Sequence, residues 1–579
     1  MTDWPIFDRT STTFPLYSRA NVGEIFPDPI SPLNASAGFQ ANLEPGWQDA
    51  FVACKVWDHD LYDKAVDRNV LPAFGSYLYI NMSLMRLFGV RVPGMGAEAV
   101  DLQYFGDMPG IPSYESERRD FDDSPEFSAS AGQWLMEEVL LAKDLATYDA
   151  DRAEVEKVRA ARPDLAALTD AELAERITAF ADLQRRLFQH HIESSLKSGV
   201  GLGAIGQLAA AVGKPELGLT LVSGIGDVDS AGPSTGMWAL SRKARTGAVA
   251  ALFDGGVPGL PERIAASTDP AIAEFRAELD AFLAEWDFRG PAEWELRALT
   301  WGLKPELALH TIDRMRGVGD DEAPAVKNAQ RAREREEATA IVRAIVAGNE
   351  ELAGQFEVSL AAAALWLRGR ERSRTTSAML VHELRLPALE LGRRGTAAGH
   401  LDDPRQIFML FADELPAYLA DPGSFTGTVR ERERVYLELF DYEPPFVVVG
   451  EAPPLSEWKR RSDRTHTAAV AGEIIQGVSG CTGVTRGRAR VLTDPDDPSA
   501  LEPGEILVAP ITDPSWTPLF VAASAVVVDV GAPFSHAAIV SRELGIPCVV
   551  SATDATGRVP DGALIEVDGT AATVTILEV

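Results

Sequence analysis

Residues 525–547 constrain the fold of this chain more than any other segment. Four apolar residues, 525–528, have the composition of a buried strand, and a turn containing Gly531 and Pro533 follows them. Ser535 then occupies the position of a helix N-cap, and His536 follows at the first helical position. The segment therefore predicts a strand, a tight turn and a helix that begins at His536.

The position of His536 at the start of a helix suits its imidazole to phosphorylation. The N-terminus of a helix carries unpaired N–H groups and a partial positive charge, so it favours phosphate. An imidazole at that position can be phosphorylated, and the helix end can hold the phosphoryl oxygens. A buried corner whose histidine only caps or packs would show the same residues. From the segment alone, both interpretations stay open.

Short apolar runs alternate with turns and at least one helix in the C-terminal part of the sequence, which is typical of an α/β domain. The runs are residues 506–509, 525–528, 548–550, 564–567 and 573–577. From about residue 128 the upstream sequence instead shows apolar residues at helical spacing. We expect helices over 165–187, 270–287, 325–366 and 375–395.

The sequence therefore predicts a multidomain fold: a large, mainly α acceptor-binding domain over 1–443 and a C-terminal α/β swivelling domain over 476–579. The stretch between them, 444–475, begins with prolines and charged residues and is predicted to be a linker.

The C-terminal residues resemble the phosphohistidine, or mobile, domain of the phosphoenolpyruvate-utilising enzymes. The resemblance runs from about Gly477 to the C-terminus through several motifs in the same order. These motifs are residues 483–491, 503–508, 512–520, the Ser-His helix, 561–562 and 567–569. Ala532 departs from the family, which often has a glycine there. The resemblance implies that His536 carries a phosphoryl group and that Ser535 caps the helix or hydrogen-bonds the phosphoryl oxygens.

Four arginines lie between residues 368 and 374 of a very acidic chain, and two of them, Arg370 and Arg374, are four residues apart. On a helix these two share one face, and two adjacent guanidinium groups suit a phosphate or a phosphohistidine. A solvated helix face with local ion pairs fits the spacing equally well.

The central region also resembles rifampicin phosphotransferase, in residues 21–33, 286–294 and 370–374. In that family a basic pair approaches the phosphohistidine when its domain docks, and it corresponds here to Arg370 and Arg374.

Charge and cysteine content limit the partners. The net charge of −32 repels nucleic acid and anionic membrane surfaces, so we expect neither as a partner. Three widely separated cysteines indicate no disulfide framework and no metal site.

The N-terminal residues show no signal-peptide pattern, and no apolar run reaches the length of a membrane span. We therefore expect a cytoplasmic protein.

Two other motifs give little support for a dinucleotide site or a metal site. Residues 201–206 match GxGxxG, but the residues before them have a helical rather than a strand pattern, which indicates a glycine-rich helix junction. His190 and His191 are adjacent and would point apart on a helix, so they make a poor metal pair. We expect them to face solvent or to pack.

The resemblance also implies which modules the chain has. Its acceptor-type motif begins close to Met1, and the chain ends soon after the Ser-His helix. We therefore expect an acceptor module and a phosphohistidine carrier. ATP and Mg²⁺ would be bound by a separate ATP-grasp subunit, as in phenylphosphate synthase, and this chain itself would bind no cofactor.

These inferences predict a phosphotransferase of the dikinase or synthase type. His536 would carry a phosphoryl group from the partner chain to a hydroxyl of a small, apolar or aromatic substrate, a chemistry that divides one difficult transfer into two steps. The general base stays open among His59, Asp58, Glu371 and His382. The alternative is a non-catalytic phosphohistidine relay or scaffold whose docking is switched by phosphorylation.

Overall fold

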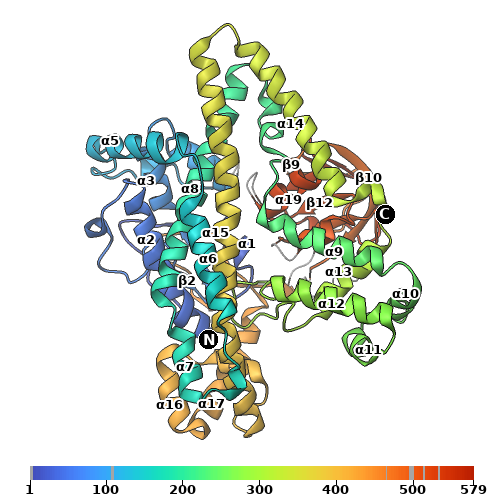
Figure 1. Cartoon of the computed structure of the whole chain (residues 1–579). Coiled ribbons are helices and arrows are strands. Elements are labelled where there is room, and N and C mark those ends of the chain that lie inside the picture. Colours follow the sequence, from blue (N-terminus) through green and yellow to red (C-terminus); the bar gives the residue numbers. More distant parts are fainter. Residues whose placement is uncertain are drawn as a thin grey trace. The chain divides into compact units, whose positions relative to one another are not determined.

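The computed structural model describes residues 4–105, 108, 110–463, 466–493, 501–512, 516–531 and 535–579 (Figure 1). The chain forms two compact units. The first consists of Met1–Gly201, Trp294–Arg297 and Ala361–Arg464, and the second of Leu202–Glu293, Ala298–Leu360 and Thr465–Val579. The predicted fold class, a mainly helical chain with a C-terminal α/β domain, is confirmed.

Helices dominate the first unit. They are α1 (Val22–Ile25), α2 (Glu44–Ala53), α3 (Met82–Arg91), α4 (Ala97–Phe105), α5 (Pro125–Trp134), α6 (Ala146–Ala160), α7 (Asp170–Thr178), residues 181–201 of α8 (Ala181–Ala211), residues 361–397 of α15 (Glu350–Ala397), α16 (Leu415–Ala420) and α17 (Pro422–Leu439). Its short strands are β1 (Leu16–Ser18), β2 (Ala73–Phe74), β3 (Tyr77–Leu78), β4 (Ile80–Asn81), β5 (Tyr442–Glu443), β6 (Val447–Val449) and β7 (Lys459–Arg460).

The predicted linker contributes ordered structure to the first unit. β6 pairs antiparallel with β1, with Leu16 opposite Val449 and Ser18 opposite Val447. β1 also pairs with β4, so the three strands form one small sheet. The boundaries predicted at 443 and 476 stay a prediction.

The long helix α15 corrects the expected helix boundaries. Helices were expected over 325–366 and 375–395, with the arginine-rich residues between them. Instead, α14 (Pro324–Val346) ends before residues 347–349, and α15 continues through residues 367–374 without a break. The arginines therefore lie on one uninterrupted helix, with Arg370 and Arg374 on the same face.

The GxGxxG motif lies inside α8, as the helical pattern before it indicated. A Cβ on Gly201 would lie 3.1 Å from the Cα of Ala363 in α15. Because a side chain there would crowd the backbone of α15, Gly201 allows the two helices to approach closely.

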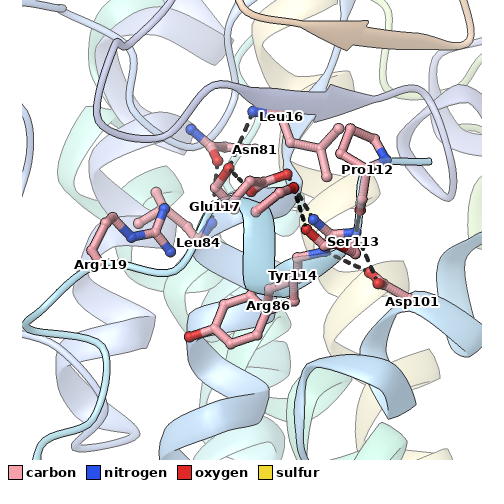
Figure 2. Close-up of polar contacts among 12 residues, drawn as sticks. Leu16, Asn81, Leu84, Arg86, Asp101, Pro112, Ser113, Tyr114, Glu117 and Arg119 are labelled. Atoms are coloured by element: carbon pink, nitrogen blue, oxygen red, sulfur yellow. Dashed lines mark hydrogen bonds and ion pairs between the residues drawn. The ribbon is translucent and has the colours of Figure 1, made fainter.

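A buried arginine holds the N-terminal part of the first unit together (Figure 2). Arg86 of α3 donates two hydrogen bonds to Asp101 of α4, one to Glu117 and one to the carbonyl of Pro112. Glu117 in turn accepts from Ser83, and the hydroxyl of Ser83 accepts from the backbone N–H of Leu16 in β1. The Arg86 side chain is fully buried, and its charge is balanced by these carboxylates.

The second unit contains a helical part and an α/β part. Its helices are α9 (Gly232–Lys243), α10 (Gly247–Asp254), α11 (Leu260–Ala266), α12 (Pro270–Trp286), α13 (Glu306–Arg316), α14, α18 (Thr517–Phe520), α19 (His536–Leu544) and α20 (Ala555–Arg558). Its strands are β8 (Ile474–Gln476), β9 (Val478–Cys481), β10 (Val484–Val491), β11 (Ile506–Ala509), β12 (Ala525–Val528), β13 (Cys548–Val550), β14 (Leu564–Asp568) and β15 (Thr573–Glu578).

These eight strands form one mixed sheet in the order β8-β15-β14-β10-β11-β12-β13-β9. β10 to β13 run parallel, and α19 connects β12 to β13. Alternate residues of the central strands face two apolar cores: Val526 and Val528 pack on the side of α19, and Ala525 and Val527 on the other side. Burial on both faces explains why these strands are continuous apolar runs in the sequence.

The core on the α19 side also contains residues of the helical part, among them Met237 and Leu240 of α9 and Ile312 and Met315 of α13. The sheet domain and the helices of the second unit therefore share one apolar core. Among the described residues, every helix falls short of the length or the apolar character that a membrane span requires.

The Arg86 network makes a testable prediction. Arg86→Met keeps the apolar length of the side chain but leaves Asp101 and Glu117 without their cation, so it should destabilise the first unit by about 3–5 kcal/mol. Urea unfolding of the two proteins measures the difference. Arg430→Met is the matched control because Arg430 and Asp402 form an exposed ion pair in the same unit, which should contribute less than about 1 kcal/mol. Equal effects of the two substitutions would contradict this account.

Candidate functional site

Local sequence determines where α19 begins and ends. Ser535 is its N-cap, with extended backbone angles, and the Ser535 hydroxyl accepts a hydrogen bond from the N–H of Ala538 at 3.4 Å. The helix ends at Gly545, whose φ of 69° is the left-handed conformation that favours glycine. The first turn of the helix carries no acidic side chain. Its partial positive charge at His536 is therefore not neutralised from within the helix.

The imidazole of His536 is held between two hydroxyl groups. Its Nδ1 lies 3.2 Å from the Thr512 hydroxyl and its Nε2 lies 2.9 Å from the Thr517 hydroxyl. The ring of Phe520 packs beside it, and only 3% of His536 is exposed. A neutral imidazole donates from one nitrogen and accepts at the other, so one hydroxyl already points a proton at a ring lone pair.

This arrangement suits a ring that gains a phosphoryl group. A threonine hydroxyl that donates to the bare nitrogen can turn and donate to a phosphoryl oxygen once that nitrogen is phosphorylated. Because the ring is buried, phosphorus can reach it only after its surroundings open.

The second pair of predicted site residues lies in the first unit. Arg370 and Arg374 share one face of α15, and Arg374 is 4% exposed and the Arg370 side chain 12% exposed. Burial excludes the solvated-face alternative for these two residues. Arg372, between them, instead pairs with Asp149.

Their positive charge is incompletely compensated. Arg370 pairs with the neighbouring carboxylate of Glu371 at 3.2 Å. Burial and the charge of Arg374 lower the pKa of Arg370, although Glu371 acts in the opposite direction. The buried Nε of Arg374 has no hydrogen-bond partner in the described part of the chain. A buried guanidinium that lacks partners is costly, so this face of α15 favours an anionic ligand.

His191 of α8 joins this cluster, a contact that sequence reasoning missed. As expected, the two adjacent histidines point apart: His190 pairs with Asp151 at 2.6 Å, and His191 packs in the interior. Nδ1 of His191 lies 3.1 Å from the hydroxyl of Ser373, which lies between Arg370 and Arg374 on α15. The signal in the sequence was a polar stripe at helical spacing, residues 370, 373, 374 and 377.

The four predicted candidates for a general base lie in different surroundings. Asp58 and His59 are exposed, and His59 pairs with Asp49. Glu371 is buried against Arg370, and His382 is buried with its Nδ1 2.9 Å from the guanidinium of Arg385. The structure thus brings Glu371 into direct contact with Arg370.

The helix that carries His536 also carries a buried carboxylate. Glu543 of α19 accepts hydrogen bonds from the N–H of Gly224 at 3.1 Å and from the side-chain amide of Asn328 in α14 at 3.2 Å. Burial raises the pKa of Glu543 to about 7, although Arg335 and these hydrogen bonds act in the opposite direction.

Comparison with protein families identifies two segments. Residues 501–572 match the mobile domain of PEP-utilising enzymes, and residues 190–371 match the fourth domain of rifampicin phosphotransferase. The first segment contains Ser535 and His536, and the second contains His191 and Arg370. The predicted resemblance to the phosphoenolpyruvate-utilising enzymes and to rifampicin phosphotransferase is confirmed over these segments.

Curated relatives match about half of the chain. An uncharacterised protein of Mycobacterium tuberculosis is 36% identical over 306 residues, which cover 53% of this chain and 32% of that protein. The prodigiosin synthesizing transferase PigC of Serratia marcescens is 32% identical over 317 residues, covering 53% and 34%. Rifampicin phosphotransferase of Streptomyces sviceus is 29% identical over 312 residues, covering 53% and 35%. The chain thus spans about a third of the length of these relatives.

Glu543 makes a prediction about pH. Its pKa is about 7 in the folded protein against an ordinary value of 4.5, so between these values the folded state binds more protons than the unfolded state. Stability should therefore fall as pH rises through this window, by up to about 3 kcal/mol. Glu543→Gln removes the titration, and the Asn328 amide can turn to pair with the new side chain.

Urea unfolding at about pH 5 and about pH 8 measures the effect. The variant should gain stability relative to the native chain at the higher pH and match it more closely at the lower one. A constant difference between the two proteins at both pH values would show that Glu543 does not titrate in this window.

Proposed function

We propose that this chain is a phosphotransferase in which His536 accepts a phosphoryl group and passes it to a hydroxyl of a small molecule. The observation that carries the proposal is the position of His536: it is the first residue of a helix N-terminus inside the segment that matches the mobile domain. The N–H groups and partial charge of that N-terminus favour the phosphoryl oxygens. A covalent intermediate of this kind divides one difficult transfer into two easier ones.

In the first step the lone pair of a His536 nitrogen attacks phosphorus, and the bond from phosphorus to the donor oxygen breaks. The hydroxyls of Thr512 and Thr517 lie beside the two ring nitrogens and can donate to the phosphoryl oxygens. We propose that ATP is the donor and that a separate ATP-grasp subunit binds it with Mg²⁺, as the resemblance to dikinases and synthases implies. The proposed setting is the cytoplasm, where the three free, buried thiols would stay reduced.

In the second step the acceptor oxygen attacks the phosphorus on His536. We propose that Arg370 and Arg374 neutralise the charge of the transferring phosphoryl group, because they are buried, adjacent and incompletely paired. The transfer step therefore takes place when the phosphorylated histidine meets this part of α15. Ser535 would keep the helix N-terminus formed during the transfer.

The acceptor that we propose is a small, apolar or aromatic molecule with a hydroxyl group. Phe188 and Trp294 lie beside His191, so aromatic rings adjoin the arginine face in the first unit. Flat rings can pack on such side chains. One relative is named for rifampicin, which together with phenol makes a reasonable pair of first probes.

One observation favours the alternative of a non-catalytic relay. The mobile-domain residues share a buried apolar core with α9 and α13, and His536 is buried beside it. A phosphoryl group on this ring would disturb that packing, so phosphorylation could act by releasing the domain. The two functions differ in whether the phosphoryl group then reaches a small molecule.

Labelled ATP tests the proposal. The chain together with an ATP-grasp subunit should gain an acid-labile label, and His536→Ala should abolish it, whereas His466→Ala, which replaces an exposed histidine of the same unit, should not. Arg374→Met should load normally but transfer to phenol or rifampicin about 10²–10³-fold more slowly.

Three results would contradict parts of the proposal. Labelling of the His536→Ala protein would move the phosphoryl site elsewhere. Labelling of the chain by ATP without a partner would show that no separate ATP-binding subunit is needed. A loaded chain that transfers to no hydroxyl compound in a broad panel would favour the relay.

A further inference from the structure

We propose that His191 takes the proton of the acceptor hydroxyl while the acceptor oxygen attacks the phosphorus carried on His536. The inference rests on the proposed function and names the general base of the transfer step. It is carried by the hydrogen bonds that fix the ring of His191 and by the unpaired polar groups around it.

The hydroxyl network around His191 is compatible with a hydrogen on Nδ1. The Ser373 hydroxyl donates to the backbone carbonyl of Arg370 at 2.9 Å. When it donates there, its lone pairs face Nδ1 of His191, 3.1 Å away. The Ser194 hydroxyl, 2.9 Å from that of Ser373, itself donates to the backbone carbonyl of His191. Nδ1 is then the N–H donor, and the lone pair of the ring lies on Nε2. The contact that holds the ring in place is thus made through Nδ1.

Two buried polar atoms around this ring are unpaired in the described structure. They are Nε of Arg374 and Nε1 of Trp294. Trp294 is 2% exposed, and its ring centre lies 5.6 Å from that of His191. Native interiors leave few such groups unpaired, so a cluster of them indicates a polar ligand. A phosphoryl group and a hydroxyl supply the acceptors that the arginine and the indole lack.

The charge around His191 keeps it in the basic form. Burial and the positive charges of Arg370 and Arg374 hold the pKa of His191 well below its ordinary value. The ring is therefore neutral at physiological pH. When a phosphoryl dianion lies between the two arginines, their charge is offset, and the same ring becomes a stronger base at the moment when a proton must be accepted.

The proposed step is balanced. The acceptor O–H bond breaks and its proton moves to Nε2 of His191, while the oxygen forms a bond to phosphorus. The bond from phosphorus to His536 breaks, and its electron pair returns to the ring nitrogen. The Nδ1–H of His191 stays bonded to Ser373, which stabilises the imidazolium that forms.

Two other candidate bases of α15 are already engaged. Glu371 is paired with Arg370, and Nδ1 of His382 faces the guanidinium of Arg385. Transferring a proton to Glu371 would remove the carboxylate that partly balances Arg370. His191 can accept a proton without breaking an existing contact.

Histidine NMR of the full chain tests the structural basis without any acceptor. With ¹⁵N-labelled histidine, the resonances of His191, assigned by their loss in His191→Asn, should show hydrogen on Nδ1 and a bare Nε2 at neutral pH. A bare Nδ1, or a doubly protonated ring, would overturn the proposal.

Kinetics test the chemical role. Asn at position 191 keeps an N–H donor near the position of Nδ1 but has no basic nitrogen, so His191→Asn should load His536 as the native chain does and transfer to phenol about 10²–10⁴-fold more slowly. Added imidazole should restore part of the rate in His191→Ala. His190→Asn, at the adjacent position, is the control and should transfer normally.

The two half-reactions keep the inference and the proposed function distinguishable. A native chain that fails to load His536 would defeat the proposed function. A His191→Asn chain that loads and then discharges to phenol at the native rate would defeat the role of His191 and leave the proposed function standing.

Discussion

A histidine at the first residue of a capped helix is the constraint on which the rest of the structure depends. The Ser535 cap fixes where α19 begins, and the strand β12 before it fixes where that helix end points. The backbone N–H groups of the first turn cannot be satisfied within the helix, so they are available to an anion. The two threonine hydroxyls at the ring nitrogens extend this set of donors. A phosphoryl group on His536 could accept hydrogen bonds from the backbone N–H groups and from the threonine hydroxyls.

The second feature on which the proposed transfer depends is the buried positive charge on α15. Keeping two guanidinium groups in the interior costs several kcal/mol for each unless their charge is balanced. Arg86, a structural arginine of the same unit, is fully hydrogen-bonded: each of its guanidinium nitrogens donates to a carboxylate or a carbonyl. Arg374 is less completely paired, because its Nε has no partner in the described chain, although the same holds for other arginines such as Arg297. What distinguishes Arg374 is its position four residues from Arg370 on α15, where an anionic ligand would offset both charges.

Local chemistry explains which features could be predicted from the sequence. The start of α19 follows from a cap residue, and the central strands follow from apolar runs buried on both faces, so the elements at 506–509, 525–528 and 548–550 agree with the structure. Periodicity also placed Arg370 and Arg374 on one helix face. It could not show what that face packs against, and so the burial of the pair was left open.

Contacts between distant residues were not predictable in the same way. His191 and Ser373 are 182 residues apart in the chain, and no local pattern joins them. The pairing of β6 with β1 and the threonine hydroxyls beside His536 also depend on the folded arrangement. The expected break near residues 367–374 was wrong, because α15 continues through these residues without interruption. Periodicity locates helix ends only approximately.

The central claim is that one imidazole carries the phosphoryl group. Mass spectrometry of peptides from the loaded chain, digested under alkaline conditions that preserve phosphohistidine, tests it most directly. The account predicts that the phosphoryl group lies on the peptide containing His536 and is lost in mild acid. A phosphoryl group found on another peptide, or one stable to acid, would contradict it.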